Sequence, residues 1–212
     1  MGHAIYRSFP CHFAKLIKMN RLVQQLAFIL EIDKLKNILR QTLLTDSSRR
    51  ENSAEHSWHL ATMAFLLAEY ATEPVVIQRV MKMLLIHDLI EIDAGDTFAY
   101  DVAGNLDRPE RERRGAERIF GLLPAEQGRE LRGLWEEFEE LKTAESKYAN
   151  ALDRLQPLLH NSVTEGGTWR IHSVARDQVY RRMEPIRTTL PEVWPVVTRI
   201  IEDACAKGWI VT

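Results

Sequence analysis

The chain has 212 residues, of which 45% are hydrophobic and 27% are charged, and its formal net charge is −2 at pH 7. This length allows one substantial domain with a buried core. The balanced charge argues against nucleic-acid binding, which needs a clustered basic patch. No apolar run approaches the roughly 18 residues of a membrane span, so no membrane partner is expected. Two cysteines, Cys11 and Cys205, form no disulfide framework and predict a reduced, cytoplasmic setting.

The N-terminal residues 1–18 carry several basic side chains but no long apolar segment, so we expect a loosely ordered extension there and no secretory signal. From residue 19 to residue 212 nearly every segment has helical periodicity, and no convincing strand alternation is present. The sequence therefore predicts a single all-α domain, a helical bundle. Apolar positions predict helical segments over 22–30 and 35–44, and further helices are expected at about 52–70, 76–93, 110–123, 124–141, 145–160, 173–189 and 192–207.

The helix expected over residues 76–93 has the most unusual composition. Residues 87–96 contain one histidine and four carboxylates within an otherwise apolar run. His87 and Glu91 lie one turn apart on the core-facing stripe. Gly95 is expected to end the helix, and Asp96 begins the loop beyond it. Burying this much polarity costs several kcal/mol unless something compensates it.

No basic residue close to these carboxylates in the sequence provides that compensation. Between Asp88 and Asp107 there is no lysine or arginine, and the first basic residue after His87 is Arg108. A divalent metal ion would compensate the carboxylates. An entirely structural explanation would require a distant segment of the chain to supply the positive charge.

Two other predicted helices carry suitable metal ligands. Asn52 and Glu55 form a capping-box pattern, and His56 follows on the apolar stripe of the helix that they begin. Asp153 lies at the edge of the stripe of the helix over 145–160. Taken alone, His56 is more often a hydrogen-bonded core histidine, and Asp153 is more often solvated or salt-bridged. Together with residues 87–96, they predict a metal ion with open coordination positions, which is typical of a catalytic site.

These motifs resemble the HD-domain superfamily of metal-dependent phosphohydrolases, and more narrowly its 5'-deoxynucleotidase branch. The resemblance covers roughly residues 35–160, and its matching segments are 51–57, 87–91, 95–96 and 151–153. It implies an HD-type helical bundle and a homodimer. The implied metal ligands are His56, His87, Asp88 and Asp153, holding Mn, Co, Mg, Fe, Ni or Zn.

The resemblance also implies roles for three further residues. Glu91 orients or deprotonates the attacking water, and Asp96 lies near the leaving oxygen. The family places a phosphate-binding arginine on the helix before the first metal-binding histidine. Arg40 is the best match if one inserted residue is allowed, and Arg49 or Arg50 is the alternative.

Three positions near these motifs need separate interpretation. Deoxynucleotidases of the family carry a tryptophan directly after the phosphate-binding arginine, where this chain has Gln41, so strict selectivity for deoxyribose does not follow. His59 is expected to support the site and not to bind metal. Trp58 is expected in the core or in a pocket wall.

The sequence thus predicts a divalent-metal-dependent phosphomonoesterase that releases phosphate from (deoxy)nucleoside 5'-monophosphates by means of a metal-activated water. One alternative is a nucleotide triphosphate or pyrophosphate hydrolase, which needs more cations than Arg40, Arg49, Arg50 and Arg154 offer near the site. Another is a non-catalytic, metal-stabilised binding module. Glu91 and Asp96 argue against that module, because a structural site needs only its four ligands.

Overall fold

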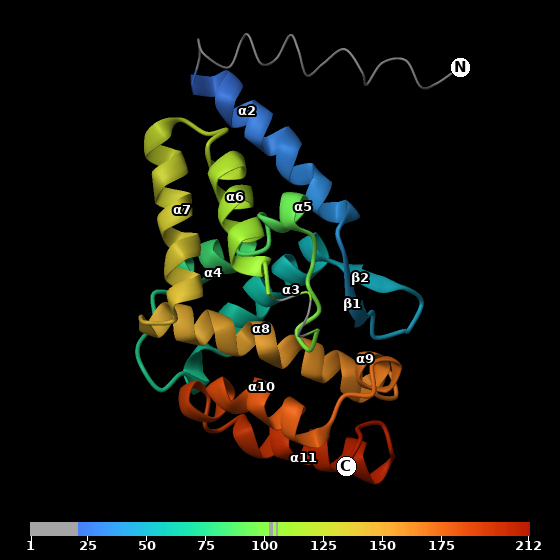
Figure 1. Cartoon of the computed structure of the whole chain (residues 1–212). Helices are drawn as coiled ribbons and strands as arrows, with labels where there is room; N and C mark the ends of the chain where they lie inside the picture. The colour runs from blue at the N-terminus through green and yellow to red at the C-terminus, as the bar shows by residue number, and fades with distance from the viewer. Residues whose placement is uncertain (1–20, 102–103, 105) are drawn as a thin grey trace, which may run out of the picture.

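The computed structural model describes residues 21–101, 104 and 106–212 (Figure 1), so the extension predicted at 1–18 lies outside the described residues. The fold is a helical bundle, as predicted. Its α-helices are α2 (Arg21–Ile32), α3 (Ser53–Leu66), α4 (Ile77–Ile86), α5 (Glu91–Ala94), α6 (Arg108–Phe120), α7 (Ala125–Glu140), α8 (Ala144–Val163), α9 (Gly167–Ile171), α10 (Arg176–Thr189) and α11 (Trp194–Ala206). Two 3₁₀ helices, η1 (Asp33–Asn37) and η2 (Ala68–Tyr70), and two strands, β1 (Leu39–Leu43) and β2 (Arg50–Asn52), complete the described elements.

Helix α8 is the central element of the bundle. It crosses the middle of the molecule and contacts α3 and α4 on one side and α10 and α11 on the other (Figure 1). Leu152, Leu155 and Leu158 along it are almost completely buried. Burial of each such side chain contributes about 1.5–3 kcal/mol. This packing fixes the position of Asp153, which α8 carries toward α3 and α4.

A second group of buried side chains lies among α2, η1, α4, α6 and α7, and includes Met83, Ile119 and Trp135. Gly115 on α6 allows a close approach to the turn after α4, because a Cβ atom there would lie 2.8 Å from the carbonyl oxygen of Ile90. Helix α6 therefore supports the turn that carries His87 and Asp88. Among the described residues, no helix is long and apolar enough to cross a membrane.

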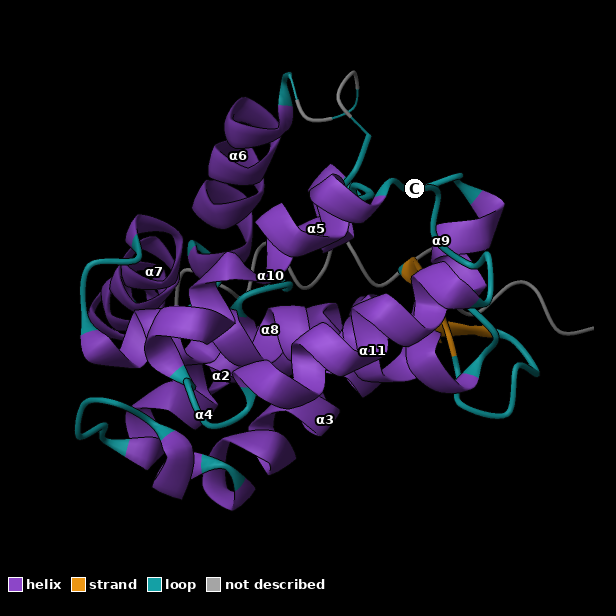
Figure 2. Ribbon diagram, turned by 90° about the horizontal axis from the view of Figure 1, so that it is seen from below, coloured by secondary structure: helices purple, strands orange, loops and turns teal. Residues whose placement is uncertain are grey.

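The helical segment predicted at 35–44 is wrong. The chain forms η1 and then β1, which pairs antiparallel with β2 in the register Leu39↔Asn52 and Leu43↔Arg50. Figure 2 shows these short strands beside α9 in an otherwise helical fold. A short apolar run fits helical and extended periodicity equally well, so only its pairing with residues 50–52 distinguishes them.

The helix predicted over 76–93 is interrupted. Helix α4 ends at Ile86, and α5 begins at Glu91. The turn between them is closed by bonds from Leu89 N–H to the Ile86 carbonyl and from Glu91 N–H to the Asp88 carbonyl. These i→i−3 bonds are tighter than α-helical bonds. The tighter turn changes the directions of the side chains around it, which a continuous helix would not do.

Other predicted boundaries are mostly correct. The capping box of Asn52 and Glu55 is formed at the start of α3, and Gly95 follows α5 with a positive φ of 75°. Helix α8 contains Pro157 and continues to Val163, beyond the predicted end at about residue 160. The residues between the helices predicted at 145–160 and 173–189 contain the end of α8 and the short helix α9. The dense packing around α8 offsets the hydrogen bond that proline removes.

Candidate active site

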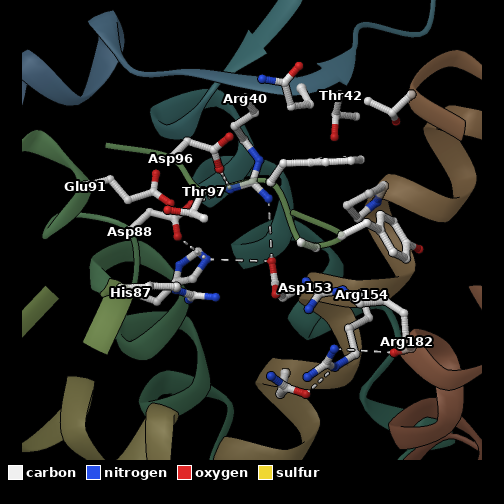
Figure 3. Close-up of a pocket in the computed structure, with 18 of the residues that line it drawn as sticks. Arg40, Thr42, His87, Asp88, Glu91, Asp96, Thr97, Asp153, Arg154 and Arg182 are labelled. Carbon is white, nitrogen blue, oxygen red and sulfur yellow. Dashed lines mark hydrogen bonds and ion pairs between the residues drawn. The ribbon is translucent and has the colours of Figure 1, made fainter. Parts of the chain in front are cut away.

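All the predicted site residues except His56 line one cavity of about 210 Å³ (Figure 3). His56 is completely buried beside Asp153. The turn between α4 and α5 contributes His87 and Asp88, and β1 contributes Arg40. Helix α8 contributes Asp153 from the opposite direction. Segments far apart in the sequence therefore meet around one polar space.

The four predicted metal ligands lie together at this cavity. His56 Nε2 is 2.9 Å from Asp153 Oδ1, and His87 Nε2 is 3.0 Å from Asp88 Oδ1 and 3.8 Å from Asp153 Oδ1. One donor atom from each of His56, His87 and Asp88 lies within 4.8 Å of the others. Two nitrogen and two oxygen donors in this arrangement suit a divalent ion.

The bonding of His87 supports this assignment. Its Nδ1–H donates to the carbonyl oxygen of Leu84 at 2.8 Å, so Nε2 faces the cluster. Among the described residues, Nε2 is buried and has no hydrogen-bond partner. A metal ion would satisfy this nitrogen, and the backbone bond at Nδ1 would fix the ring orientation. The residues present therefore fit a divalent metal.

The charges around His87 are strongly coupled. Burial lowers the pKa of His87, but Asp88 and Asp153 outweigh burial and raise it to about 9. Burial raises the pKa of Asp153, but the hydrogen bond with His56 and the nearby ring of His87 hold it well below its usual range. Without metal, His87 therefore carries a proton beside the ionised carboxylate of Asp153. Metal binding must displace this proton.

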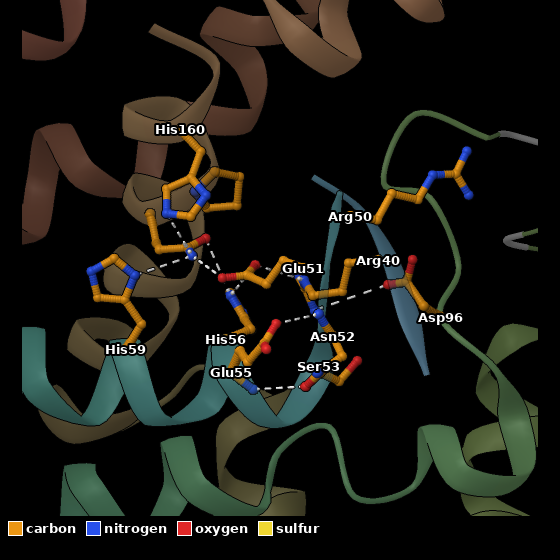
Figure 4. Close-up of polar contacts among 12 residues, drawn as sticks. Arg40, Arg50, Glu51, Asn52, Ser53, Glu55, His56, His59, Asp96 and His160 are labelled. Carbon is orange, nitrogen blue, oxygen red and sulfur yellow. Dashed lines mark hydrogen bonds and ion pairs between the residues drawn. The ribbon is translucent and has the colours of Figure 1, made fainter. Parts of the chain in front are cut away.

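His56 is oriented by a buried hydrogen-bond network (Figure 4). His160 Nδ1–H donates to the carbonyl oxygen of Leu43 at 2.9 Å, which leaves His160 Nε2 as an acceptor. The Gln156 amide donates to His160 Nε2 at 3.2 Å and to Glu51 Oε1 at 2.6 Å. The amide oxygen of Gln156 then accepts the His56 Nδ1–H at 3.2 Å. This sequence of bonds directs His56 Nε2 toward Asp153 and the metal cluster.

A second group of possible ligands, Glu51, His59 and His160, also lies within 4.8 Å. The Gln156 Nε2 atom is 2.6 Å from Glu51 Oε1, 3.4 Å from His59 Nδ1 and 3.2 Å from His160 Nε2. An amide nitrogen therefore lies among these three side chains, where an ion would have to sit. The group is a hydrogen-bond network behind His56. Trp58 is 66% exposed and does not line the cavity, so its predicted place in the core or pocket wall is wrong.

Glu91 and Asp96 both face the cluster. Ser53 Oγ–H donates to Glu91 Oε2 at 2.7 Å, and Glu91 is buried. Burial and the neighbouring Asp88 raise the pKa of Glu91 well above its ordinary value, against the effect of Arg40. Burial also raises the pKa of Asp96, and Arg40 again opposes the rise. Two carboxyl groups that retain protons easily thus lie beside the predicted ligands.

Of the three arginines considered for phosphate binding, Arg40 lies in the cavity. Its Nη1 donates to Asp88 Oδ2 at 2.7 Å, and it is 3.9 Å from carboxylate oxygens of Asp96 and of Asp153. Arg49 is paired with Glu55 at the surface. Arg50 is exposed and points away from His56 (Figure 4).

Gln156 and Glu51, which support His56, and Arg182 in the cavity wall were not identified from the sequence. Gln156 lies three residues after Asp153 on α8, and Glu51 lies five residues before His56, so their spacing was the available signal. Arg154, which was expected from the sequence among the cations near the site, lines the cavity next to Asp153, where burial and the neighbouring Arg182 lower its pKa to about 10. Arg182 comes from α10, and nothing in its local sequence indicated this position.

Aromatic and amide side chains form another part of the cavity wall. Phe98 and Tyr100 line it, with ring centroids 5.3 Å apart. Phe98 also lies 4.2 Å from the ring of His172, whose Nε2–H donates to Gln41 Oε1 at 3.4 Å. Gln41, adjacent to Arg40, therefore lies next to an aromatic surface.

Comparison with known proteins agrees with this geometry. A family model described as HD domain matches residues 32–194. The human 5'-deoxynucleotidase HDDC2 is 28% identical over 141 residues, which cover 66% of this chain and 68% of the human protein. The bovine 5'-deoxynucleotidase HDDC2 is also 28% identical over 141 residues, covering 66% of this chain and 67% of the bovine protein.

A crystal structure of a predicted metal-dependent phosphohydrolase from Magnetospirillum magnetotacticum MS-1 is 56% identical to this chain. It superposes with a TM-score of 0.86 and covers 91% of this chain and 96% of its own. The family model spans most of the chain, and the four predicted ligands lie close together. This chain therefore belongs to the HD domain family and is a hydrolase that depends on a divalent metal ion.

Proposed function

We propose that the chain is a phosphomonoesterase that releases phosphate from nucleoside or deoxynucleoside 5'-monophosphates. The observation that carries this proposal is the position of Arg40, which lines the same cavity as His87, Asp88, Asp153, Glu91 and Asp96 and is paired with Asp88. A guanidinium binds two phosphate oxygens at once. The 5'-deoxynucleotidase relatives support a nucleotide substrate.

The proposed reaction divides the work among the metal, Arg40 and two carboxyl groups. A divalent ion held by His56, His87, Asp88 and Asp153 would lower the pKa of a water molecule and neutralise a phosphate oxygen. Arg40 binds other phosphate oxygens and stabilises charge that develops during the reaction. Glu91 orients the attacking water and accepts its proton. Asp96, whose pKa is raised, donates a proton to the leaving alcohol oxygen.

The sugar and base are proposed to lie against the aromatic part of the wall. Phe98 and Tyr100 offer ring surfaces for stacking, and Gln41 offers an amide beside them. An amide accepts and donates hydrogen bonds, so it tolerates a ribose hydroxyl that a tryptophan at this position would exclude. We therefore propose that ribonucleotides and deoxyribonucleotides are both accepted.

The test is phosphate release from a panel of ribo- and deoxyribonucleoside mono- and triphosphates. The protein is stripped with a chelator and reloaded with Mn, Co, Mg or Zn. We expect release from monophosphates that requires metal and is lost in His87→Ala. Release of pyrophosphate or of phosphate from triphosphates alone would support the alternative hydrolase. Metal binding without any release from the panel would contradict the proposed substrate class.

We also propose a cytoplasmic homodimer. The reduced setting rests on the small number of cysteines, of which Cys205 is a free thiol. The dimer is supported by α2, on which Leu22, Leu26, Ile29 and Leu30 are all exposed. An apolar face of this kind is typical of an interface. Light scattering on the full chain measures the assembly, and a monomer at micromolar concentration would contradict it.

A further inference from the structure

Two arginines lie beside Asp153 on the side away from the turn between α4 and α5 (Figure 3). Arg154 comes from α8 and Arg182 from α10, and both line the cavity. Arg154 Nη1 donates to the carbonyl oxygen of Arg182 at 3.4 Å. Arg182 Nη2 lies 3.8 Å from Asp153 Oδ2. Two positively charged side chains from different helices are thus held next to one another.

The partners of Arg154 are neutral. Its Nε donates to Asn150 Oδ1 at 2.6 Å, and its other hydrogen bond goes to a backbone carbonyl. In the described part of the chain, no carboxylate forms an ion pair with Arg154. By contrast, Arg108, another cation of the cavity wall, is paired with Glu112 at 2.5 Å. The charge of Arg154 therefore has no dedicated counterion.

Arg182 lies near the carboxylate of Asp153, which already has other partners. Asp153 Oδ1 lies 2.9 Å from His56 Nε2, and Asp153 is a proposed ligand of the metal ion. Its carboxylate charge is then shared with the metal ion, which leaves the two arginines short of negative charge. A pair of guanidinium groups in this condition is suited to a phosphate group, to which each can donate two hydrogen bonds.

We propose that Arg154 and Arg182 form a second anion subsite, which binds a further phosphate group of the substrate. The subsite rests on the proposed function and extends its substrates to nucleotides that carry a second phosphate. Asp153 lies between the two phosphate positions, because Oδ1 is 3.9 Å from Arg40 Nη2 and Oδ2 is 3.8 Å from Arg182 Nη2. The second phosphate is attached either to another sugar position or to the first phosphate.

Binding to the metal-loaded chain tests the subsite without requiring turnover. Titration calorimetry compares a deoxynucleoside 5'-monophosphate with its 3',5'-bisphosphate and its 5'-diphosphate, at short times or on ice if hydrolysis occurs. We expect at least one of the two doubly phosphorylated ligands to bind about tenfold or more tightly than the monophosphate, since charge-assisted hydrogen bonds are strong. The better of the two identifies where the second phosphate is attached.

Two variants and a matched control assign that preference to the subsite. For each doubly phosphorylated ligand that binds more tightly than the monophosphate, the ratio of the two affinities should fall toward one in Arg182→Gln and in Arg154→Gln. Arg181→Gln alters a neighbouring side chain that is 75% exposed and paired with Asp177, so the ratio should not change. Metal content and melting temperature confirm that each variant is folded and loaded. Arg182→Gln is informative even if Arg154→Gln loses metal, because Arg182 lies on a different helix from Asp153.

The outcomes separate the subsite from the proposed function. Equal binding of all three ligands, or a preference that both variants retain, would overturn the subsite. Preferential binding that the variants remove, without phosphate release from any ligand, would support the subsite and contradict the proposed phosphomonoesterase. Release from the monophosphate alone, with no binding preference, would support the enzyme and contradict the subsite.

Discussion

The two histidines of the cluster are held in different ways. His87 is fixed by a backbone carbonyl one turn earlier, that of Leu84. His56 is fixed by Gln156, which lies 100 residues away and is itself held by Glu51 and His160. The orientation of His87 is therefore a local property of one helix end, whereas that of His56 requires the whole bundle to be assembled. A substitution that disturbs packing far from the site should therefore change the orientation of His56 more than that of His87.

The largest effect is expected from the loss of a predicted metal ligand in the turn between α4 and α5. His87→Ala or Asp88→Ala should abolish turnover and weaken metal binding by more than the roughly 10- to 100-fold typical of supporting residues. The variants should remain folded, because the cores formed by α8 and by α6 do not depend on these side chains. Phosphate release, calorimetry with Mn or Co, and circular dichroism measure the three properties. Unchanged turnover in either variant would contradict the assignment.

Glu91→Gln should have the next largest effect on turnover. The amide keeps the shape of the carboxylate and can still accept the hydrogen bond from Ser53, but it cannot take a proton. Loss of a general base typically lowers the rate by about 100- to 10,000-fold. Metal affinity should change much less than kcat. A variant with wild-type kcat would show that Glu91 has no part in proton transfer.

Gln156→Ala tests the distant support of His56. It removes the acceptor for His56 Nδ1–H and leaves Glu51 without its amide donor. Metal affinity should fall about 10- to 100-fold. The half-buried Gln127, which bonds Gln25 far from the site, gives a matched control in Gln127→Ala. Nitrogen NMR of the histidine rings should show Nδ1 of His56 protonated in the wild type. Wild-type metal affinity in Gln156→Ala would contradict the inference that His56 depends on distant support.

The smallest expected effect is the dependence of metal affinity on pH. In the metal-free chain the pKa of His87 is about 9, so at pH 7 the ring is protonated and must lose a proton to bind metal. Metal affinity should therefore rise as the pH increases from 7 toward 9. Calorimetry at pH 7 in two buffers of different ionisation enthalpy should show proton release. Binding heats that do not depend on the buffer would contradict the raised pKa.

The part of the site that the sequence predicts is the part with local spacing. His87, Asp88 and Glu91 follow one another within five residues, and the capping box at Asn52 marks the start of the helix that carries His56. The break after Ile86 was missed, because apolar periodicity continues through it.

Longer-range contacts were not available from the sequence. Strand β1 exists because residues 39–43 pair with 50–52, and this pairing is not visible in the periodicity of either segment. Gln156 lies on the same helix as Asp153, but its partners come from α3 and the segment before it. Arg182 reaches the cavity only through the packing of α10 on α8. Trp58, by contrast, has an apolar character that suggested burial, yet it lies on the exposed face of α3.

Anomalous diffraction from crystals loaded with Mn or Co is the most direct test of the metal centre. We predict one strong peak among His56, His87, Asp88 and Asp153. Gln156 should keep its position among Glu51, His59 and His160. A peak among those three residues, or the absence of a peak at the first group in fully loaded protein, would contradict the central assignment.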